Sequence, residues 1–231
     1  MRSTISRKRV FAEKTGTSRS KTRLRPLCLV VASILLGFAS NAQATWQKMF
    51  TQPSGNPFRA CYFFNERVGF IAGNIQDGVY KTTDGGQSWS LTKFPLNPSG
   101  DKPVGFVSQI LMRNALNGWL TCEQDSLIPP RPALYQTTDG GLSWIPTGVM
   151  GRASDIDTTA SAIVVTNRLT TSTGFVSANG GFSFNNAIPV TNGVDFVDDL
   201  NGVATGFNEQ VWYHSIDGGL TWQGLSQADI I

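Results

Sequence analysis

The sequence predicts an all-β protein, a β-propeller or propeller fragment of about four four-stranded blades with one leading strand. A short box that begins with Thr or Ser and ends with an aromatic residue occurs four times. Its acidic or amide position falls at residues 84, 139, 179 and 217, close to the period of about 40 residues that is typical of propeller blades. After residue 44, no stretch of about ten residues shows the apolar periodicity of a helix.

Each box combines a hydroxyl residue, an acid or amide, a glycine and an aromatic ring. In a tight turn the acid accepts hydrogen bonds from the following backbone N–H groups and from the hydroxyl, while glycine adopts the unusual backbone angles. The aromatic ring is expected to be buried between blades. The box residues are Thr82, Asp84, Gly86 and Trp89; Thr137, Asp139, Gly141 and Trp144; Asn179, Gly181 and Phe184 in a worn copy; and Ser215, Asp217, Gly219 and Trp222. These acids are needed for geometry rather than for proton transfer.

Turn and strand signals place the remaining elements around each box. Before three of the boxes, an apolar residue is followed by Asn or Asp two positions later and by Gly four positions after that, which predicts a hairpin. Short apolar strands are expected at 69–73, 118–122 and 202–206, strands that run into the box at 78–82, 133–137 and 211–215, and a fourth strand after each box. The predicted blades are 58–92, 104–147, 158–187 and 194–224.

The box has the form S/T-x-D-x-G-x-S/T-W and resembles the Asp-box, or bacterial neuraminidase repeat, of sialidases and many secreted propellers. With the preceding F-x-D/N-x-x-x-G-F/W signature, residues 46–224 most resemble the photosystem II stability/assembly factor family. That family usually forms a closed ring of more blades. Trp46 resembles a box Trp whose own blade is missing. The chain is therefore expected to be either truncated or a small, open propeller that hides its edges against a partner.

Residues 1–44 are predicted to be a secretory signal peptide. A basic segment with nine Lys or Arg precedes the apolar run 27–39, and Ala42-Gln43-Ala44 has the A-x-A form of a cleavage site. Without this segment, 10 Lys and Arg face 15 Asp and Glu, a net charge of about −5, in place of +3 for the whole chain. Nucleic-acid binding is therefore not expected. The predicted location is secreted or periplasmic, or the thylakoid lumen in a phototroph.

A sialidase-like enzyme is the catalytic alternative, and the residues argue against it. Phe58-Arg59-Ala60 stands where sialidases carry an F/Y-R-I-P motif, and it lacks the Ile-Pro. Tyr80, Tyr135 and Tyr213 recur at the same place before a box, which indicates packing rather than a nucleophile. The sequence therefore predicts that the protein is not an enzyme.

Other candidate chemistry is weak. His214 is the only histidine and lacks partners for a zinc site or a catalytic triad. Asp155-x-Asp157 lacks the further ligands of a calcium loop and is interpreted as a polar inter-strand loop. No metal site and no cofactor are predicted. Cys61 and Cys122 can form a disulfide or remain as two buried free thiols, and the sequence leaves both open.

Non-catalytic protein binding is the predicted function. The candidate contacts are the arginines Arg59, Arg113, Arg131 and Arg152, together with the inserted loop 123–131. By resemblance, the partner is a membrane complex under assembly, photosystem II in a phototroph. A secreted Asp-box protein with a cell-surface or extracellular partner is the alternative.

Overall fold

The computed structural model describes residues 48, 50–95, 104–124, 131–167, 174–189, 192–206 and 211–225. The chain divides into two compact units, Met1–Gln47 and Lys48–Ile231, and all described residues belong to the second. The predicted signal peptide and the leading strand at Trp46 lie outside the described residues.

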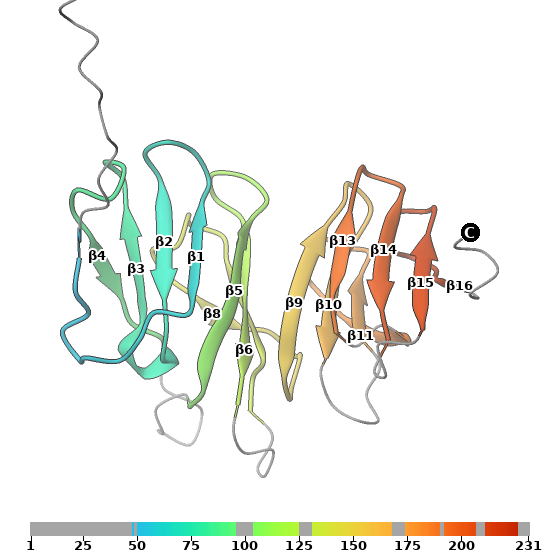
Figure 1. The fold of residues 1–231 in the computed structure, drawn as a ribbon, viewed down its shortest axis with the longest axis horizontal. Coiled ribbons are helices and arrows are strands. Elements are labelled where there is room, and N and C mark those ends of the chain that lie inside the picture. The colour runs from blue at the N-terminus through green and yellow to red at the C-terminus, as the bar shows by residue number, and fades with distance from the viewer. Residues whose placement is uncertain are drawn as a thin grey trace, which may run out of the picture. The chain divides into compact units, whose positions relative to one another are not determined.

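Four antiparallel sheets of four strands each form the second unit, and the strands pair in chain order within each sheet (Figure 1). Blade 1 contains β1 (Ala60–Phe63), β2 (Gly69–Ala72), β3 (Val79–Thr82) and β4 (Ser90–Thr92), with a 3-10 turn, η2 (Ile75–Asp77), between β2 and β3. Blade 2 contains β5 (Phe106–Met112), β6 (Gly118–Glu123), β7 (Leu134–Thr137) and β8 (Ile145–Pro146). Blade 3 contains β9 (Ala153–Thr158), β10 (Ile163–Asn167), β11 (Gly174–Ser177) and β12 (Asn185–Ile188). Blade 4 contains β13 (Val194–Phe196), β14 (Gly202–Thr205), β15 (Trp212–Ser215) and β16 (Gln223–Leu225). The all-β fold and the four blades are as predicted.

Side-chain oxygens close the first hairpin of each blade. The Asn65 side chain accepts hydrogen bonds from the N–H groups of Arg67 and Val68 at 2.9 and 2.8 Å. Asn114 and Asp198 accept equivalent bonds in blades 2 and 4. This is the local turn chemistry that Asn and Asp favour, and it explains why the sequence signature marks these three hairpins.

Blade 3 begins at Ala153, earlier than the predicted boundary at residue 158. Its first strand contains Asp155 and Asp157, so the interpretation of these two acids as an inter-strand loop was wrong. The hairpin after β9 uses Thr159, whose hydroxyl accepts from the N–H of Ala162 at 3.0 Å. Because Thr replaces Asn or Asp at this turn, the signature that located the other first strands is missing.

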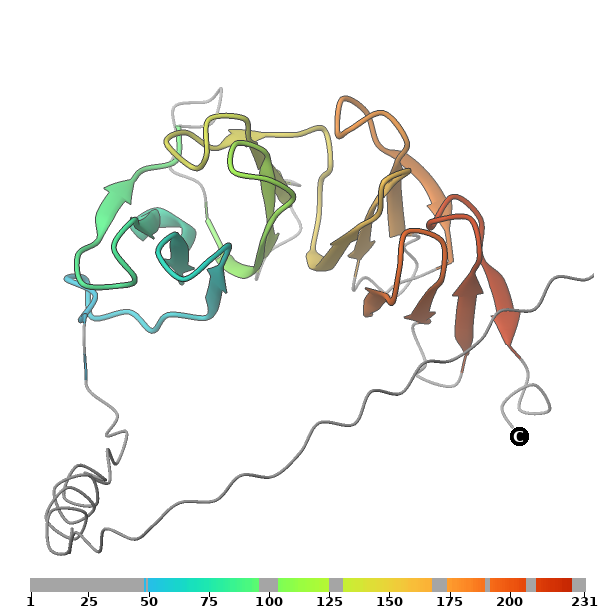
Figure 2. The ribbon, with the colours of Figure 1, turned by 90° about the horizontal axis from the view of Figure 1, so that it is seen from above.

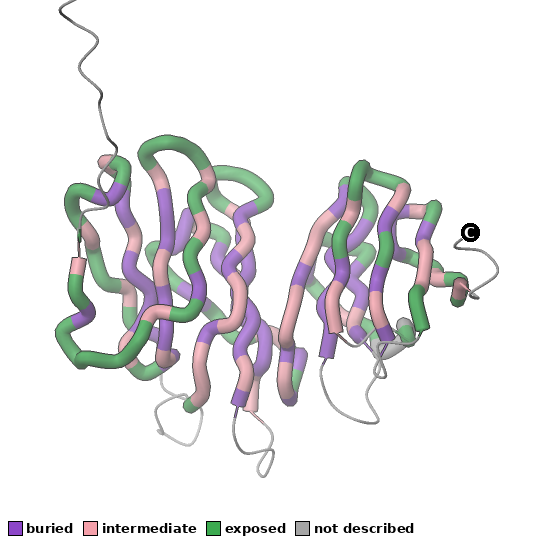
Figure 3. The backbone as a smooth tube through the Cα atoms, in the orientation of Figure 1, coloured by how far each residue is buried: buried purple, intermediate pink, exposed green. Residues whose placement is uncertain are grey.

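The core lies between blades, and it repeats with each junction. The innermost strands β1, β5, β9 and β13 contact one another in sequence (Figure 2). One buried cluster joins blades 1 and 2, a second joins blades 2 and 3, and a third joins blades 3 and 4. Buried residues accordingly run along the strands, and exposed residues concentrate at the hairpins (Figure 3).

In blades 2, 3 and 4, the second glycine of the box lies against the preceding blade. A Cβ atom on Gly141 would stand 2.5 Å from the Phe70 ring, and one on Gly219 would stand 2.6 Å from the Val164 side chain. A Cβ on Gly181 would stand 3.0 Å from Trp119 Nε1. Only glycine therefore lets the box hairpin pack this closely, and its positive φ adds a second requirement.

The outer face of blade 4 carries exposed apolar side chains. Val203 stands where Phe70, Trp119 and Val164 stand in the earlier blades, and it is 43% exposed. Trp212, on the same face, is 44% exposed. On the sheet face of blade 1 opposite to that of Phe70, Phe50 packs on Phe58, Tyr80 and Trp89.

We expect Gly141→Ala to lower the free energy of unfolding by about 2–5 kcal/mol, because overpacking of the buried Phe70 ring adds to the backbone strain at φ 84°. Gly180→Ala is the matched control, since its φ is 73° and its Cβ would meet nothing within 4 Å. Gly180→Ala should lower the free energy of unfolding only by the backbone strain, about 1–2 kcal/mol. Urea unfolding measures both, and equal losses would contradict the inter-blade role of Gly141.

Candidate functional site

The acid of each box is occupied by hydrogen bonds within its own turn. In the first box, the Thr82 hydroxyl donates to Asp84 at 2.7 Å, and the Ser88 N–H donates to Asp84 at 2.9 Å. The N–H of Gly86 donates in turn to the Thr82 hydroxyl at 2.8 Å. The same bonds form around Asp139 and Asp217. These acids therefore hold the box hairpins closed.

The pKa values of the box acids follow from these bonds. Hydrogen bonds from the Ser88 hydroxyl, the Ser88 N–H and the Thr82 hydroxyl lower the pKa of Asp84. At Asp139, partial desolvation raises the pKa, but hydrogen bonds from Ser143 and Thr137 outweigh it and bring the pKa to about 2. A permanently ionised carboxylate is a poor general acid or base near neutral pH.

The worn box keeps the turn but loses the indole. Asn179 accepts from the Ser183 N–H at 3.0 Å and donates to the Ser183 hydroxyl at 2.8 Å, so the amide closes the hairpin as the acid does elsewhere. In the first and fourth boxes, Trp89 and Trp222 donate Nε1–H to the carbonyl oxygens of Gly86 and Gly219, each at 3.0 Å. Phe184 has no donor for the corresponding bond.

Asp155 and Asp157 join blade 3 to blade 4. Their carboxylates accept hydrogen bonds from the N–H groups of Val194 and Phe196 on β13, at 3.0 and 2.9 Å. Desolvation by burial raises the pKa of both carboxyl groups, against the lowering effect of these bonds. Both acids therefore take part in blade packing. Among the described residues, no group of three or more His, Cys, Asp or Glu side chains is placed to hold a metal ion.

Arg113 also joins blades, and its part in partner binding stays a prediction. Its guanidinium donates to the carbonyl oxygens of Thr159 and Ala160 in blade 3, at 2.6 and 2.9 Å. The residue follows β5, at the hairpin end that carries the boxes. The sequence could not show this role, because the two carbonyls belong to a different blade.

The other three candidate arginines lie at the end of the blades opposite the boxes, here called the loop end. Arg59, Arg131 and Arg152 precede β1, β7 and β9, whose far ends lead to the hairpins and boxes (Figure 1). Arg59 is exposed, and its guanidinium lies 4.0 Å from the centre of the Phe106 ring, a cation–π contact between blades 1 and 2. Arg131 and Arg152 lie next to each other in space, since the Gly151 N–H donates to the Arg131 carbonyl at 3.1 Å.

The inserted loop 123–131 starts and ends at the loop end. Residues 125–130 lie outside the described residues. Its base is anchored by Gln124, which is buried and donates to the Pro132 carbonyl at 3.0 Å. The bridge between Pro132 and Met150 holds the loop base beside the segment that carries Arg152.

Cys61 and Cys122, the two cysteines within the described residues, are free thiols in the structure. Cys61 lies on β1 and is exposed, so the expectation that both thiols are buried was wrong for this residue. Cys122 lies on β6 and is fully buried, and burial raises the pKa of its thiol. The disulfide between them, left open by the sequence, is not formed here. His214 is half-buried on β15, opposite Val203.

Carbon-13 NMR of the carboxyl groups should separate the two classes of acid. Asp139 is expected to titrate near pH 2, and Asp155 and Asp157 above the ordinary Asp pKa of about 3.9. Because the pKa of Asp139 is depressed by folding, its contribution to stability is present above about pH 4 and is lost as the pH falls towards 2. The contribution of Asp155 and Asp157 has the opposite sign, since ionisation above their raised pKa values lowers stability.

Asp139→Asn is the control for this titration, since Asn179 shows that an amide keeps the turn. The variant should lose the titration near pH 2 and part of the acid sensitivity of urea unfolding. Titration of Asp139 at an ordinary Asp pKa would contradict the hydrogen-bonded turn.

No protein-family model and no curated protein matches the chain. Solved structures do match. An ancestral GH74 enzyme aligns with a TM-score of 0.56 and 20% identity, over 81% of this chain and 26% of that one. YCF48 bound to D1 peptide aligns with a TM-score of 0.54 and 18% identity, over 78% and 58%. The C-terminal WD40 domain of Sif2 aligns with a TM-score of 0.52 and 8% identity, over 77% and 50%.

These neighbours include both an enzyme and a peptide-bound protein, at identities that carry information on the fold alone. The chain spans about a quarter of the GH74 enzyme and less than two thirds of YCF48. In the described part of the chain, no helix is both long and apolar enough to cross a membrane. The comparisons and the four antiparallel sheets together show a β-propeller or a fragment of one.

Proposed function

We propose that this chain is a non-catalytic, protein-binding propeller that resembles the photosystem II stability/assembly factor. The observation that carries the proposal is the set of three arginines, Arg59, Arg131 and Arg152, at the loop end. The similarity to YCF48 bound to D1 peptide supports a polypeptide as the ligand. The partner would be a membrane complex under assembly.

Electrostatics favour the loop end over the box end as the binding surface. The box end carries the ionised acids Asp84, Asp139 and Asp217, all engaged in hydrogen bonds within their turns. Arginine at the loop end offers planar, multiple donors that suit carboxylates and backbone carbonyls of a peptide. The inserted loop 123–131 adds a feature that the other blades lack, and such insertions commonly carry binding.

The proposed location follows from residues 1–44, which have the order of a secretory signal peptide. The protein would act in the periplasm or outside the cell, or in the thylakoid lumen of a phototroph. If the source is not photosynthetic, the same surface would serve a cell-surface or extracellular partner.

We expect Arg59→Glu/Arg131→Glu to weaken binding of a fluorescein-labelled D1 peptide at least tenfold in fluorescence polarisation, because two attractive charges become repulsive. Affinity of the unaltered protein should fall as salt rises. Arg67→Glu is the matched control, an exposed arginine at the box end, and it should bind as the unaltered protein does. Equal affinity of the double variant would contradict the loop-end surface.

Catalysis is tested separately with a fluorogenic sialoside. We expect no turnover by the purified protein, because Asp84, Asp139 and Asp217 are held as ionised turn acids. Turnover that Arg59→Ala abolishes would replace the binding proposal with a sialidase-like activity.

A further inference from the structure

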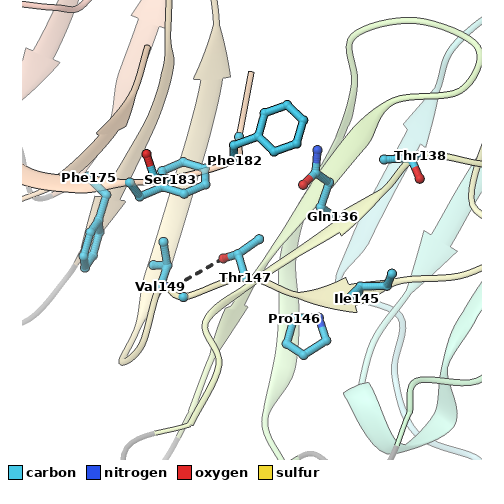
Figure 4. Close-up of a pocket in the computed structure, with 12 residues that line it drawn as sticks. Gln136, Thr138, Ile145, Pro146, Thr147, Val149, Phe175, Phe182 and Ser183 are labelled. Carbon is cyan, nitrogen blue, oxygen red and sulfur yellow. Dashed lines mark hydrogen bonds between the residues drawn. The ribbon is translucent and has the colours of Figure 1, made fainter. Parts of the chain in front are cut away.

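A cavity of about 530 Å³ opens between blades 2 and 3 (Figure 4). Blade 3 lines it with three aromatic residues, Phe175, Phe182 and Phe184, and blade 2 lines it with Gln136, Thr147 and Val149 among others. The volume is within the range of about 300–1,000 Å³ that is typical of sites for small ligands. We call this cavity the inter-blade pocket. The corresponding place in the junction between blades 1 and 2 is closed by side-chain hydrogen bonds.

The junction between blades 1 and 2 is closed by two side-chain hydrogen bonds. Lys81 donates to the Gly140 carbonyl at 2.7 Å, and Thr92 donates to the Gly141 carbonyl at 3.0 Å. The corresponding residues in blade 2 are Gln136 and Thr147. The Thr147 hydroxyl donates to Leu134 within its own blade, at 3.1 Å, and accepts from Val149. Neither residue bonds to the box of blade 3, so the outer part of the junction stays open.

The worn box leaves one acceptor unused beside the pocket. The indole N–H groups of Trp89 and Trp222 donate to the carbonyl oxygens of Gly86 and Gly219, and the Thr92 hydroxyl donates to that of Gly141. Gly181, at the same place in blade 3, lines the pocket. Within the described residues, no donor bonds to its carbonyl oxygen. The pocket thus combines aromatic walls with an acceptor that is paired in the other three boxes.

We propose that the inter-blade pocket binds a tryptophan side chain presented by a partner polypeptide. Indole matches the aromatic lining and carries the N–H donor that the worn box lacks. Pairing of a partner strand with the edge strand β8 is less suitable, because β8 is two residues long and ends in Pro146, which has no N–H. Phe182, 94% exposed at the mouth, and Ile145, 61% exposed, would cover the inserted ring.

This site is independent of the loop-end arginines, since none of Arg59, Arg131 and Arg152 lines the pocket. Its test therefore uses a probe without a peptide sequence. Fluorine-19 NMR of N-acetyl-5-fluorotryptophan amide would be recorded with the purified protein. We expect saturable broadening and a shift of the fluorine signal. The comparison probe, N-acetyl-4-fluorophenylalanine amide, lacks a ring donor and should bind at least threefold more weakly.

Phe184→Trp is the decisive variant. Trp stands at this position in the other three boxes, so the larger ring is compatible with the turn, and it would fill the pocket from within. We expect at least tenfold weaker binding of the indole probe, with cooperative urea unfolding retained. Phe182→Ala should also weaken binding severalfold, and the side chain is too exposed for this change to affect folding. Leu142→Ala, at the same box position in blade 2 and 70% exposed, is the matched control and should change nothing.

Three results would overturn the proposal. They are absence of binding by the unaltered protein, unchanged binding in Phe184→Trp or Phe182→Ala, and equal binding of the two probes. None of these results bears on the D1 peptide experiment, which depends on the loop end.

Discussion

The close contact between the second glycine of the box in blades 2, 3 and 4 and the preceding blade is the interaction on which the rest of the structure depends. Gly141, Gly181 and Gly219 each approach a side chain of the blade before, so that a Cβ atom would collide or crowd. The acid or amide two residues earlier holds the turn that delivers this glycine. The local hydrogen bonds therefore fix the conformation of the box hairpin, and the hairpin fixes the spacing between blades.

Residues that do not repeat adjust the individual junctions. Arg113 ties blade 2 to the hairpin of blade 3, and Asp155 and Asp157 tie blade 3 to the first strand of blade 4. The half-buried carboxylates of Asp155 and Asp157 have backbone partners that offset their desolvation. Charged side chains that look like surface groups in the sequence thus have a structural role.

Much of the fold could be predicted from local signals, and the exceptions have physical reasons. Boxes and first hairpins were recognisable because their hydrogen bonds join residues two to four positions apart. The start of blade 3 was missed because Thr159 replaces the usual Asn or Asp. The role of Arg113 was missed because its acceptors lie 46 and 47 residues away. The inter-blade pocket was likewise unpredictable, since it depends on where Thr147 directs its hydroxyl.

By itself, the sequence determined the repeat, the turn chemistry and the all-β class, because each depends on residues that are close in the chain. Only the tertiary structure decided which charged side chains contact another blade, as Arg59, Arg113 and Asp155 do. It also decided that the junction between blades 2 and 3 is open, since Phe184, Gln136 and Thr147 come from two blades. The reason is the same in each case: a side chain's partner across a junction is set by blade packing, and no spacing within one repeat encodes it.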